Sequence, residues 1–196
     1  MKIIKQSQKA LIEAAAFLEN GGVVICPTDT VYGFLALASN RKAVENIFKI
    51  KKRPRSKPLA VFVFNIKQAK EIAEINKDQE KILKKFWPGK FTFILKIKKN
   101  IDFRCLSKLI VGKGDTIGIR IPKYKFLNDL LKKINKPLAQ TSVNISGQPA
   151  LTKIADIIEK FGGSDPPMLI IDGGNLPESN PSKIIDLTSP HLTRIR

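Results

Sequence analysis

The chain has 196 residues, of which 43% are hydrophobic, and a formal net charge of +18. This length fits one globular domain, 1–196, that buries a core without covalent staples. Two widely separated cysteines argue against a disulfide framework, and a single histidine leaves too few ligands for a His-based zinc site or a Ser-His-Asp triad. No signal peptide and no apolar run near ~18 residues is visible, so we expect a cytoplasmic protein with no membrane partner.

The excess of positive charge has two explanations. Lysine and arginine number 35 against 17 acidic residues, and such a field attracts nucleic acid or nucleotide phosphates. A lysine-rich, solvated surface produces the same excess without any ligand. Composition alone leaves both explanations open.

Helical and extended patterns alternate along the chain, which predicts an α/β fold with a sheet that is at least partly parallel. The long polar stretches 27–40, 99–115 and 173–182 are expected to be loops, and such loops often carry function. The helices are predicted at 8–20, 41–51, 66–74, 77–86, 127–134 and 154–161, and the strands at 23–26, 59–64, 91–97, 116–121, 137–141, 168–172, 183–187 and 191–196.

The first candidate site is the segment Pro-Thr-Asp-Thr-Val-Tyr-Gly at 27–33, which follows a buried strand. Ligands in open α/β sheets bind at the carboxyl ends of strands. Two hydroxyls, a carboxylate and a phenol in this segment could hold a small polar substrate. A polar turn that uses aspartate and glycine for its local geometry is the alternative.

The second candidate is a cluster of cations at the end of the helix 41–51 and in the loop after it. Cations at a helix C-terminus are stabilised by the helix dipole alone, at about 0.3–1 kcal/mol each. The same side chains could instead clamp a polyphosphate, since arginine and lysine both bind phosphate oxygens. No Walker loop or G-x-G-x-x-G motif occurs, so ATP would have to meet such a clamp. The cluster comprises Lys49, Lys51, Lys52, Arg53, Arg55 and Lys57.

Two further segments carry polar groups next to predicted strands. Gln-Thr-Ser-Val-Asn-Ile-Ser-Gly at 140–147 delivers hydroxyls and amides that suit phosphate, ribose or carboxylate, although an ordinary Asn/Ser turn looks the same. Arg120 lies among apolar neighbours in the strand 116–121. It points either to a solvated face or inward, where it would need an anion.

Taken together, these segments resemble the YrdC/TsaC family of threonylcarbamoyl-AMP synthases, from about residue 8 onward. No single motif is specific, but seven in this order are. They are the 27–33 motif, Lys-x-Arg-Pro at 51–54, Lys-Pro-Leu at 57–59, Trp-Pro-Gly at 87–89 with Thr92 after it, Arg120-x-Pro122, Thr-Ser-x-Asn-x-Ser-Gly at 141–147, and a closing segment at 172–196.

The resemblance implies a twisted, mostly mixed sheet flanked by helices around a large basic cavity. It implies an L-threonylcarbamoyladenylate synthase, a nucleotidyltransferase that joins L-threonine, bicarbonate and ATP, with Mg²⁺ on the ATP, and releases pyrophosphate. A tRNA-modifying threonylcarbamoyl transferase complex would then use the product, and binding of tRNA or double-stranded RNA would fit the charge.

The resemblance also assigns residues. Lys51 and Arg53 would act in catalysis beside the phosphates, and no protein-bound metal is implied. The threonine side would comprise Thr30, Arg120, Ser142 and Ser182. The nucleotide side would comprise Arg53, Lys57, Thr116, Asn144, Thr152 and Arg196.

Three departures from the family pattern stand out. Many longer relatives have a histidine where this chain has Phe62, so any role of that histidine is lost or supplied otherwise. Lys183 follows Ser182 where a small hydroxyl residue is usual. The sequence stops at Arg196, and the extra domain of longer relatives is not part of it.

Two alternatives remain. A non-catalytic protein that binds double-stranded RNA or tRNA, or that assists ribosome maturation, would explain the charge. RNA-binding modules, however, usually expose aromatic side chains for stacking, and most aromatics here lie in apolar core patterns. A carbamoyl-transferring hydrogenase maturation domain is the other alternative, although the acylphosphatase and zinc modules of such proteins are not in this sequence.

Overall fold

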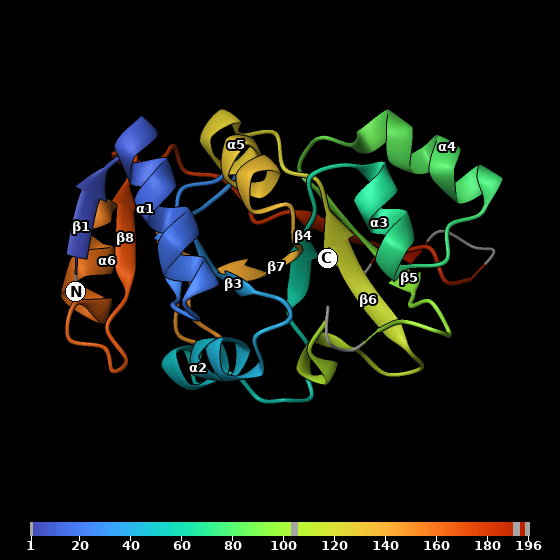
Figure 1. Cartoon of the computed structure of the whole chain (residues 1–196), viewed down its shortest axis with the longest axis horizontal. Coiled ribbons are helices and arrows are strands. Elements are labelled where there is room, and N and C mark those ends of the chain that lie inside the picture. Colours follow the sequence, from blue (N-terminus) through green and yellow to red (C-terminus); the bar gives the residue numbers. More distant parts are fainter. Residues whose placement is uncertain (1, 103–105, 190–192, 195–196) are drawn as a thin grey trace.

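The computed structural model describes residues 2–102, 106–189 and 193–194, and these form one mixed sheet with helices packed on it (Figure 1). The order of the strands within the described residues is β1-β8-β2-β3-β7-β4-β6-β5-β9-β10. The pairs β1–β8, β2–β8, β4–β6 and β5–β9 are parallel, and the other neighbours are antiparallel. The predicted α/β class with a mixed sheet is therefore confirmed.

Most predicted elements are present, with ends that shift by a few residues. The strands are β1 Lys2–Lys5, β2 Val24–Cys26, β3 Gly33–Leu37, β4 Ala60–Phe62, β5 Phe91–Lys96, β6 Thr116–Arg120, β7 Leu138–Ser142, β8 Leu169–Asp172, β9 Lys183–Asp186 and β10 Thr193–Arg194. The helices are α1 Gln8–Glu19, α2 Arg41–Lys51, α3 Ile66–Ile72, α4 Lys77–Phe86, α5 Lys125–Ile134 and α6 Ile154–Phe161, with a 3₁₀ turn, η1, at Lys108–Ile110.

Polar caps fix where several helices begin. The Ser7 hydroxyl accepts a hydrogen bond from the Ala10 amide at 3.1 Å at the start of α1. Asn40 caps α2 in the same way, accepting from the Ala43 amide. Such caps satisfy amides that have no partner within the helix and contribute about 1 kcal/mol each. Each of these helices therefore begins directly after its capping residue.

The sheet buries apolar side chains on both of its faces. In β3, Phe34 and Ala36 belong to one cluster of buried residues, whereas Leu35 and Leu37 belong to the other. This alternation is the two-residue period of a strand. Helices α1 and α5 pack on the second cluster, and α2 and α6 pack on the first. The central strands are thus covered on both sides, which fixes their register.

Two strands were missed by the sequence analysis. Residues 27–40 were expected to be a loop, but Gly33–Leu37 forms β3, in which every residue is buried. A strand that is buried on both faces is continuously apolar and so shows no alternation of polar and apolar residues. The strand β1, Lys2–Lys5, was also not predicted, because a four-residue edge strand shows little pattern. Of the strand predicted at 191–196, only Thr193–Arg194 lies within the described residues.

The segment 173–182 crosses the molecule without a helix or strand, as expected. The buried Tyr32 hydroxyl donates to the Gly174 carbonyl at 2.7 Å and accepts from the Gly173 amide at 3.0 Å. Burial raises the pKa of Tyr32 to about 12, so the phenol keeps its proton and can donate. One side chain from the 27–33 motif therefore holds the start of this segment.

We predict that Tyr32→Phe lowers the free energy of unfolding by about 1 kcal/mol, because the Gly173 amide and the Gly174 carbonyl lose their hydrogen bonds to the buried hydroxyl. The measurement is urea denaturation. Tyr124→Phe is the matched control, since the half-buried Tyr124 hydroxyl makes a hydrogen bond only to the exposed Gln6 side chain among the described residues. Equal losses in the two variants would contradict this role of Tyr32.

Candidate active site

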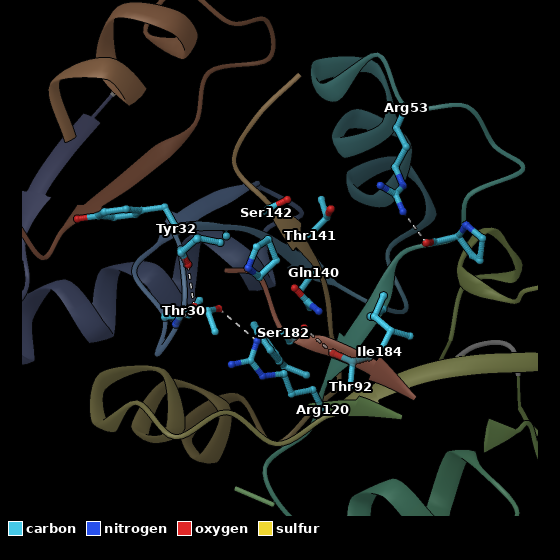
Figure 2. Close-up of a pocket in the computed structure, with 17 residues that line it drawn as sticks. Thr30, Tyr32, Arg53, Thr92, Arg120, Gln140, Thr141, Ser142, Ser182 and Ile184 are labelled. Atoms are coloured by element: carbon cyan, nitrogen blue, oxygen red, sulfur yellow. Dashed lines mark hydrogen bonds between the residues drawn. The ribbon is translucent and has the colours of Figure 1, made fainter. Parts of the chain in front are cut away.

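A cavity of about 120 Å³ opens where the loop between β2 and β3 meets the ends of β6 and β7 and the segment before β9 (Figure 2). It is smaller than the ~300–1,000 Å³ of a site for a drug-sized ligand, so it suits a small polar molecule. Its lining comprises Thr28, Thr30, Val31, Tyr32, Gly33, Arg53, Pro58, Ala60, Phe62, Thr92, Arg120, Gln140, Thr141, Ser142, Pro181, Ser182 and Ile184.

The 27–33 motif forms the turn of an antiparallel hairpin between β2 and β3, not the expected strand-to-helix loop. The Thr28 hydroxyl donates its only proton to the Val31 carbonyl at 2.7 Å. The Thr28–Thr30 hydroxyl contact, at 3.0 Å, must therefore be donated by Thr30. With its proton used in this way, Thr30 can offer a substrate only an acceptor.

Arg120 lies at the end of β6, and its side chain points inward. Among the described residues, its Nε donates to the Gly89 carbonyl at 2.9 Å, one terminal nitrogen donates to Thr30 Oγ1 at 3.3 Å, and the other donates to Asp29 Oδ1 at 2.5 Å. Only 3% of its side chain is exposed. Burial lowers the pKa of Arg120, and the Asp29 carboxylate opposes this shift. The anion that an inward arginine needs is thus part of the protein.

Phe62 occupies the wall of the cavity beneath Arg120. Its ring centroid lies 5.6 Å from the guanidinium carbon, which is close enough for a cation–π contact. The position at which many longer relatives have histidine therefore supplies an apolar face here. That face supports Arg120 and provides no hydrogen bond to a substrate.

Two hydroxyls meet in the wall of the cavity. Thr92, on β5, and Ser182, just before β9, are both buried, and their oxygens lie 2.8 Å apart. The parallel pairing of Phe91 with Lys183 sets these two hydroxyls side by side. A further hydrogen bond joins the segment before β9 to the hairpin turn: the Ser179 hydroxyl donates to the Thr30 carbonyl at 2.8 Å.

Lys51 is buried and faces the end of β7 instead of the cavity. Its ammonium donates to the Ser142 carbonyl at 2.6 Å, to the Asn144 carbonyl at 3.0 Å and to Asn144 Oδ1 at 2.8 Å. Asn144 Oδ1 also accepts from the Ser142 hydroxyl at 2.7 Å. Lys51 thus holds the turn that carries Ser142 and Asn144. Burial, and secondarily the charge of Arg53, lowers the pKa of Lys51 to about 7.

Arg53 lies at the rim of the cavity and braces its own loop. Its Nε donates to the Lys57 carbonyl at 2.7 Å, and a terminal nitrogen donates to the Pro58 carbonyl at 3.0 Å. The loop therefore presents a fixed guanidinium, whereas the Lys57 side chain is exposed. Lys52 ends α2 in the left-handed conformation, with φ 50°, and turns the chain into this loop.

Of the remaining predicted nucleotide residues, those within the described part of the chain are not in the cavity lining. Thr116 starts β6, four residues and roughly 13 Å from Arg120 at ~3.3 Å per residue. Its hydroxyl donates to the Lys113 carbonyl at 3.0 Å. Thr152 is half-buried, and its carbonyl accepts from the Leu176 amide. Arg196 lies outside the described residues.

The described cavity carries little net charge, so the large basic cavity that the resemblance implied stays a prediction. Arg53 and Arg120 are the cationic residues of the described lining, and Asp29 neutralises Arg120. Hydroxyls make up most of the polar lining. No described residues form a cluster of three or more acidic, histidine or cysteine side chains able to hold a metal ion. Among the helices of the described residues, none is long and apolar enough to cross a membrane.

Several residues that build the site lie in segments that the sequence singled out, but no individual role was assigned to them. Asp29 and Thr28 belong to the 27–33 motif, where local polarity could not separate their roles from that of Thr30. Thr92 follows the Trp-Pro-Gly motif, but its partner Ser182 is 90 residues away, so no local pattern connects them. Gln140 and Phe62 line the cavity from β7 and β4, because these two strands are neighbours.

Together, the mixed sheet and the hydroxyl-lined cavity define an α/β protein with a site for a small polar substrate. The family model Sua5/YciO/YrdC, described as "Telomere recombination", matches residues 16–196. The chain belongs to this family, which confirms the resemblance that the motifs indicated.

Named relatives are similar over most of this chain. A threonylcarbamoyl-AMP synthase from Pyrococcus abyssi is 36% identical over 176 residues, which cover 89% of this chain and 50% of the relative. A Methanocaldococcus jannaschii protein, whose name gives the same activity provisionally, is 36% identical over 200 residues, which cover 100% of this chain and 91% of the relative. The chain thus spans about half the length of the first relative and nine tenths of the second.

A solved structure of P. abyssi Sua5 complexed with L-threonine has the same fold. It matches with a TM-score of 0.87 and 33% sequence identity, and the match covers 100% of this chain and 56% of that chain. The fold predicted from the resemblance is therefore confirmed over the length of this chain.

We predict that Lys51 makes folding stability depend on pH. Its pKa of about 7 in the folded protein is below the ~10.4 of an unfolded chain, so between these values the unfolded state binds the extra proton. Stability from this group therefore rises with pH above 7. The difference in unfolding free energy between the wild type and Lys51→Met should grow by up to about 1.4 kcal/mol per pH unit from pH 7 to 9.

Urea denaturation at pH 6, 7, 8 and 9 measures this difference. Lys49→Met is the control, because Lys49 is an exposed lysine on the same helix. A difference between the wild type and Lys51→Met that stays constant from pH 6 to 9 would show that Lys51 remains charged throughout.

Proposed function

We propose that this protein is an L-threonylcarbamoyladenylate synthase, a nucleotidyltransferase that condenses L-threonine, bicarbonate and ATP and releases pyrophosphate. One observation carries the proposal. Thr30, Arg120, Ser142 and Ser182, the residues expected on the threonine side, all line the same small cavity. A related structure with the same fold is a complex with L-threonine, and named synthases are similar over most of this chain.

The cavity offers complementary groups to a free amino acid. Arg120 would bind the carboxylate, since guanidinium groups bind planar anions through two parallel N–H donors. Thr30 would accept an N–H or O–H from the substrate, because its own proton is used by Thr28. Ser142 and Ser182 add hydroxyls, and Phe62 and Ile184 add apolar surface for a methyl group.

The nucleotide would lie beyond the cavity, because about 120 Å³ cannot contain ATP as well as an amino acid. Arg53, at the rim, is the group best placed to contact its phosphates. Lys57 is exposed in the same loop and would add charge. Asn144, Thr116, Thr152 and Arg196 remain candidates for the ribose and base side.

The chemistry needs no covalent enzyme intermediate. Bicarbonate takes up a proton and loses water to give carbon dioxide; the neutral threonine amine adds to its carbon and loses a proton, which gives a carbamate. A carbamate oxygen then attacks the α-phosphorus of ATP, and the bond to the pyrophosphate breaks. Negative charge grows on the leaving group, and a fixed cation such as Arg53 stabilises it. Holding the carbamate in line with the α-phosphate supplies the remaining acceleration.

Lys51 supports this reaction from a distance. All three described hydrogen bonds of its ammonium go to the turn that carries Ser142 and Asn144. We therefore assign Lys51 a positioning role in place of the catalytic contact that the resemblance implied. Mg²⁺ would arrive on the ATP phosphates, because the described residues hold no acidic cluster for it.

The similar proteins favour a synthase over a non-catalytic RNA-binding protein. In a synthase, the charge of +18 would serve ATP and, secondarily, tRNA. The product would pass to a threonylcarbamoyl transferase complex that modifies tRNA, so we expect the protein in the cytoplasm.

We predict that the purified protein, given ATP, Mg²⁺, bicarbonate and L-threonine, releases pyrophosphate and forms threonylcarbamoyl adenylate. The measurement combines a coupled pyrophosphate assay with mass detection of the adenylate. Omission of threonine is the control. Pyrophosphate release at the same rate without threonine would rule out the synthase and favour a different use of ATP.

We predict that Arg53→Ala lowers the rate of pyrophosphate release about 10²–10³-fold, because a positioned charged donor is lost from the rim. The matched control is Arg55→Ala, two residues along the same loop. Arg55 is exposed and lies 3.7 Å from Glu45, so its loss should change the rate less than about twofold. Equal rates for the two variants would indicate that the cation cluster at 49–57 is an ordinary solvated surface.

A further inference from the structure

The buried guanidinium of Arg120 is constrained on all its nitrogens. Its described hydrogen bonds to Gly89, Thr30 and Asp29 use three of its five N–H groups. One N–H remains on each terminal nitrogen, in a side chain that lines the cavity (Figure 2). This is the pair of donors that a carboxylate needs.

Asp29 contributes to this arrangement from outside the described cavity lining. Its side chain is 8% exposed. One oxygen accepts from Arg120 at 2.5 Å, and the other accepts from the Lys123 amide at 3.1 Å. The carboxylate therefore joins the guanidinium to the backbone just after β6, and it can act on a substrate only through Arg120.

Both oxygens of Asp29 are needed for this geometry. An asparagine in its place has the same size but only one oxygen, so one of the two donors would face an amide N–H instead. The guanidinium would lose either its fixed position or its link to the backbone. Because bidentate recognition tolerates displacements of only ~0.5 Å, a small shift removes one of the two substrate bonds.

We propose that Asp29 is a positioning residue that sets the Arg120 guanidinium for the carboxylate of the amino-acid substrate. The proposal rests on the proposed function, since it takes that substrate to be a free amino acid. Asp29 makes the site selective for a carboxylate over the corresponding amide. Neutralisation by Asp29 also keeps the empty cavity from holding simple inorganic anions tightly.

The test measures binding of L-threonine and of L-threonine amide by titration calorimetry, with the amide in competition where it binds weakly. The proteins are the wild type, Asp29→Asn, Asp29→Glu and Asp129→Asn. Asp129 is the matched control, because it is an exposed aspartate on α5 whose described ion pair is with Lys125, at 2.9 Å. Thermal unfolding of each protein confirms that it is folded before binding is measured.

We expect the wild type and Asp129→Asn to bind threonine more tightly than its amide. Asp29→Asn should bind threonine ~10-fold more weakly, about the worth of one charge-assisted hydrogen bond, and the amide within about twofold of the wild type. Asp29→Glu keeps the negative charge and should recover part of the preference for threonine, which also tests the idea if Asp29→Asn does not fold.

Two results would overturn the proposal. One is an unchanged preference for threonine over the amide in Asp29→Asn. The other is an equal loss of affinity for both ligands, which would show a merely structural role. Pyrophosphate release is measured separately, so a protein that binds threonine through Asp29 but makes no adenylate would refute the proposed activity alone. A wild type that binds no threonine would refute both.

Discussion

Arg120 places a positive charge inside the protein, and the architecture of the cavity is built around that charge. Burial of an unpaired guanidinium would cost several kcal/mol, and removal of one partner of such a pair commonly costs about 3–5 kcal/mol. The hairpin turn between β2 and β3 supplies Asp29 and Thr30, the turn after Trp87 supplies the Gly89 carbonyl, and β4 supplies the ring of Phe62. Elements distant in sequence are thereby held at one point.

The second buried cation, Lys51, is satisfied in a different way. Carbonyl and amide oxygens of Ser142 and Asn144 surround its ammonium, and no described carboxylate contacts it. The two buried cations thus hold two different turns: Arg120 secures the β2–β3 turn, and Lys51 secures the turn after β7. Since both charges are paired with groups of the protein, the cavity is more polar than basic, and Arg53 at its rim is the other cation of the described lining.

The parts of the fold that could be predicted from the sequence are those with a local physical signal. Ser7 can cap the helix predicted from residue 8, and it does so because a cap acts within three residues. The strand β3 was missed because burial on both faces removes the alternation that identifies a strand. Motif order correctly predicted the family, but it could not show that Lys51 faces away from the cavity. That fact depends on packing between α2 and the end of β7.

The site residues also fall into two groups: those that the motifs indicated and those that only the folded structure brings together. Thr30 and Arg120 were placed on one cavity by resemblance, and the structure brings them within hydrogen-bonding distance. Asp29 was visible as a polar residue in the motif, but its partner is 91 residues away. Only the order of the strands in the sheet brings the two members of such a pair together. An arginine predicted to be buried therefore indicates that an anionic or polar partner exists, although the sequence does not show which residue that partner is.

The pairing of distant strands also bears on synthesis of the protein. β1 pairs with β8, and β5 pairs with β9, so the sheet joins segments that leave the ribosome far apart in time. Contacts of such long sequence separation form slowly, and domains with many of them fold late. Thr92 is made long before Ser182, its partner in the cavity wall. On the ribosome, this cavity wall can therefore form only after Ser182 has emerged, so the earlier segments carry exposed strand edges that chaperones would recognise.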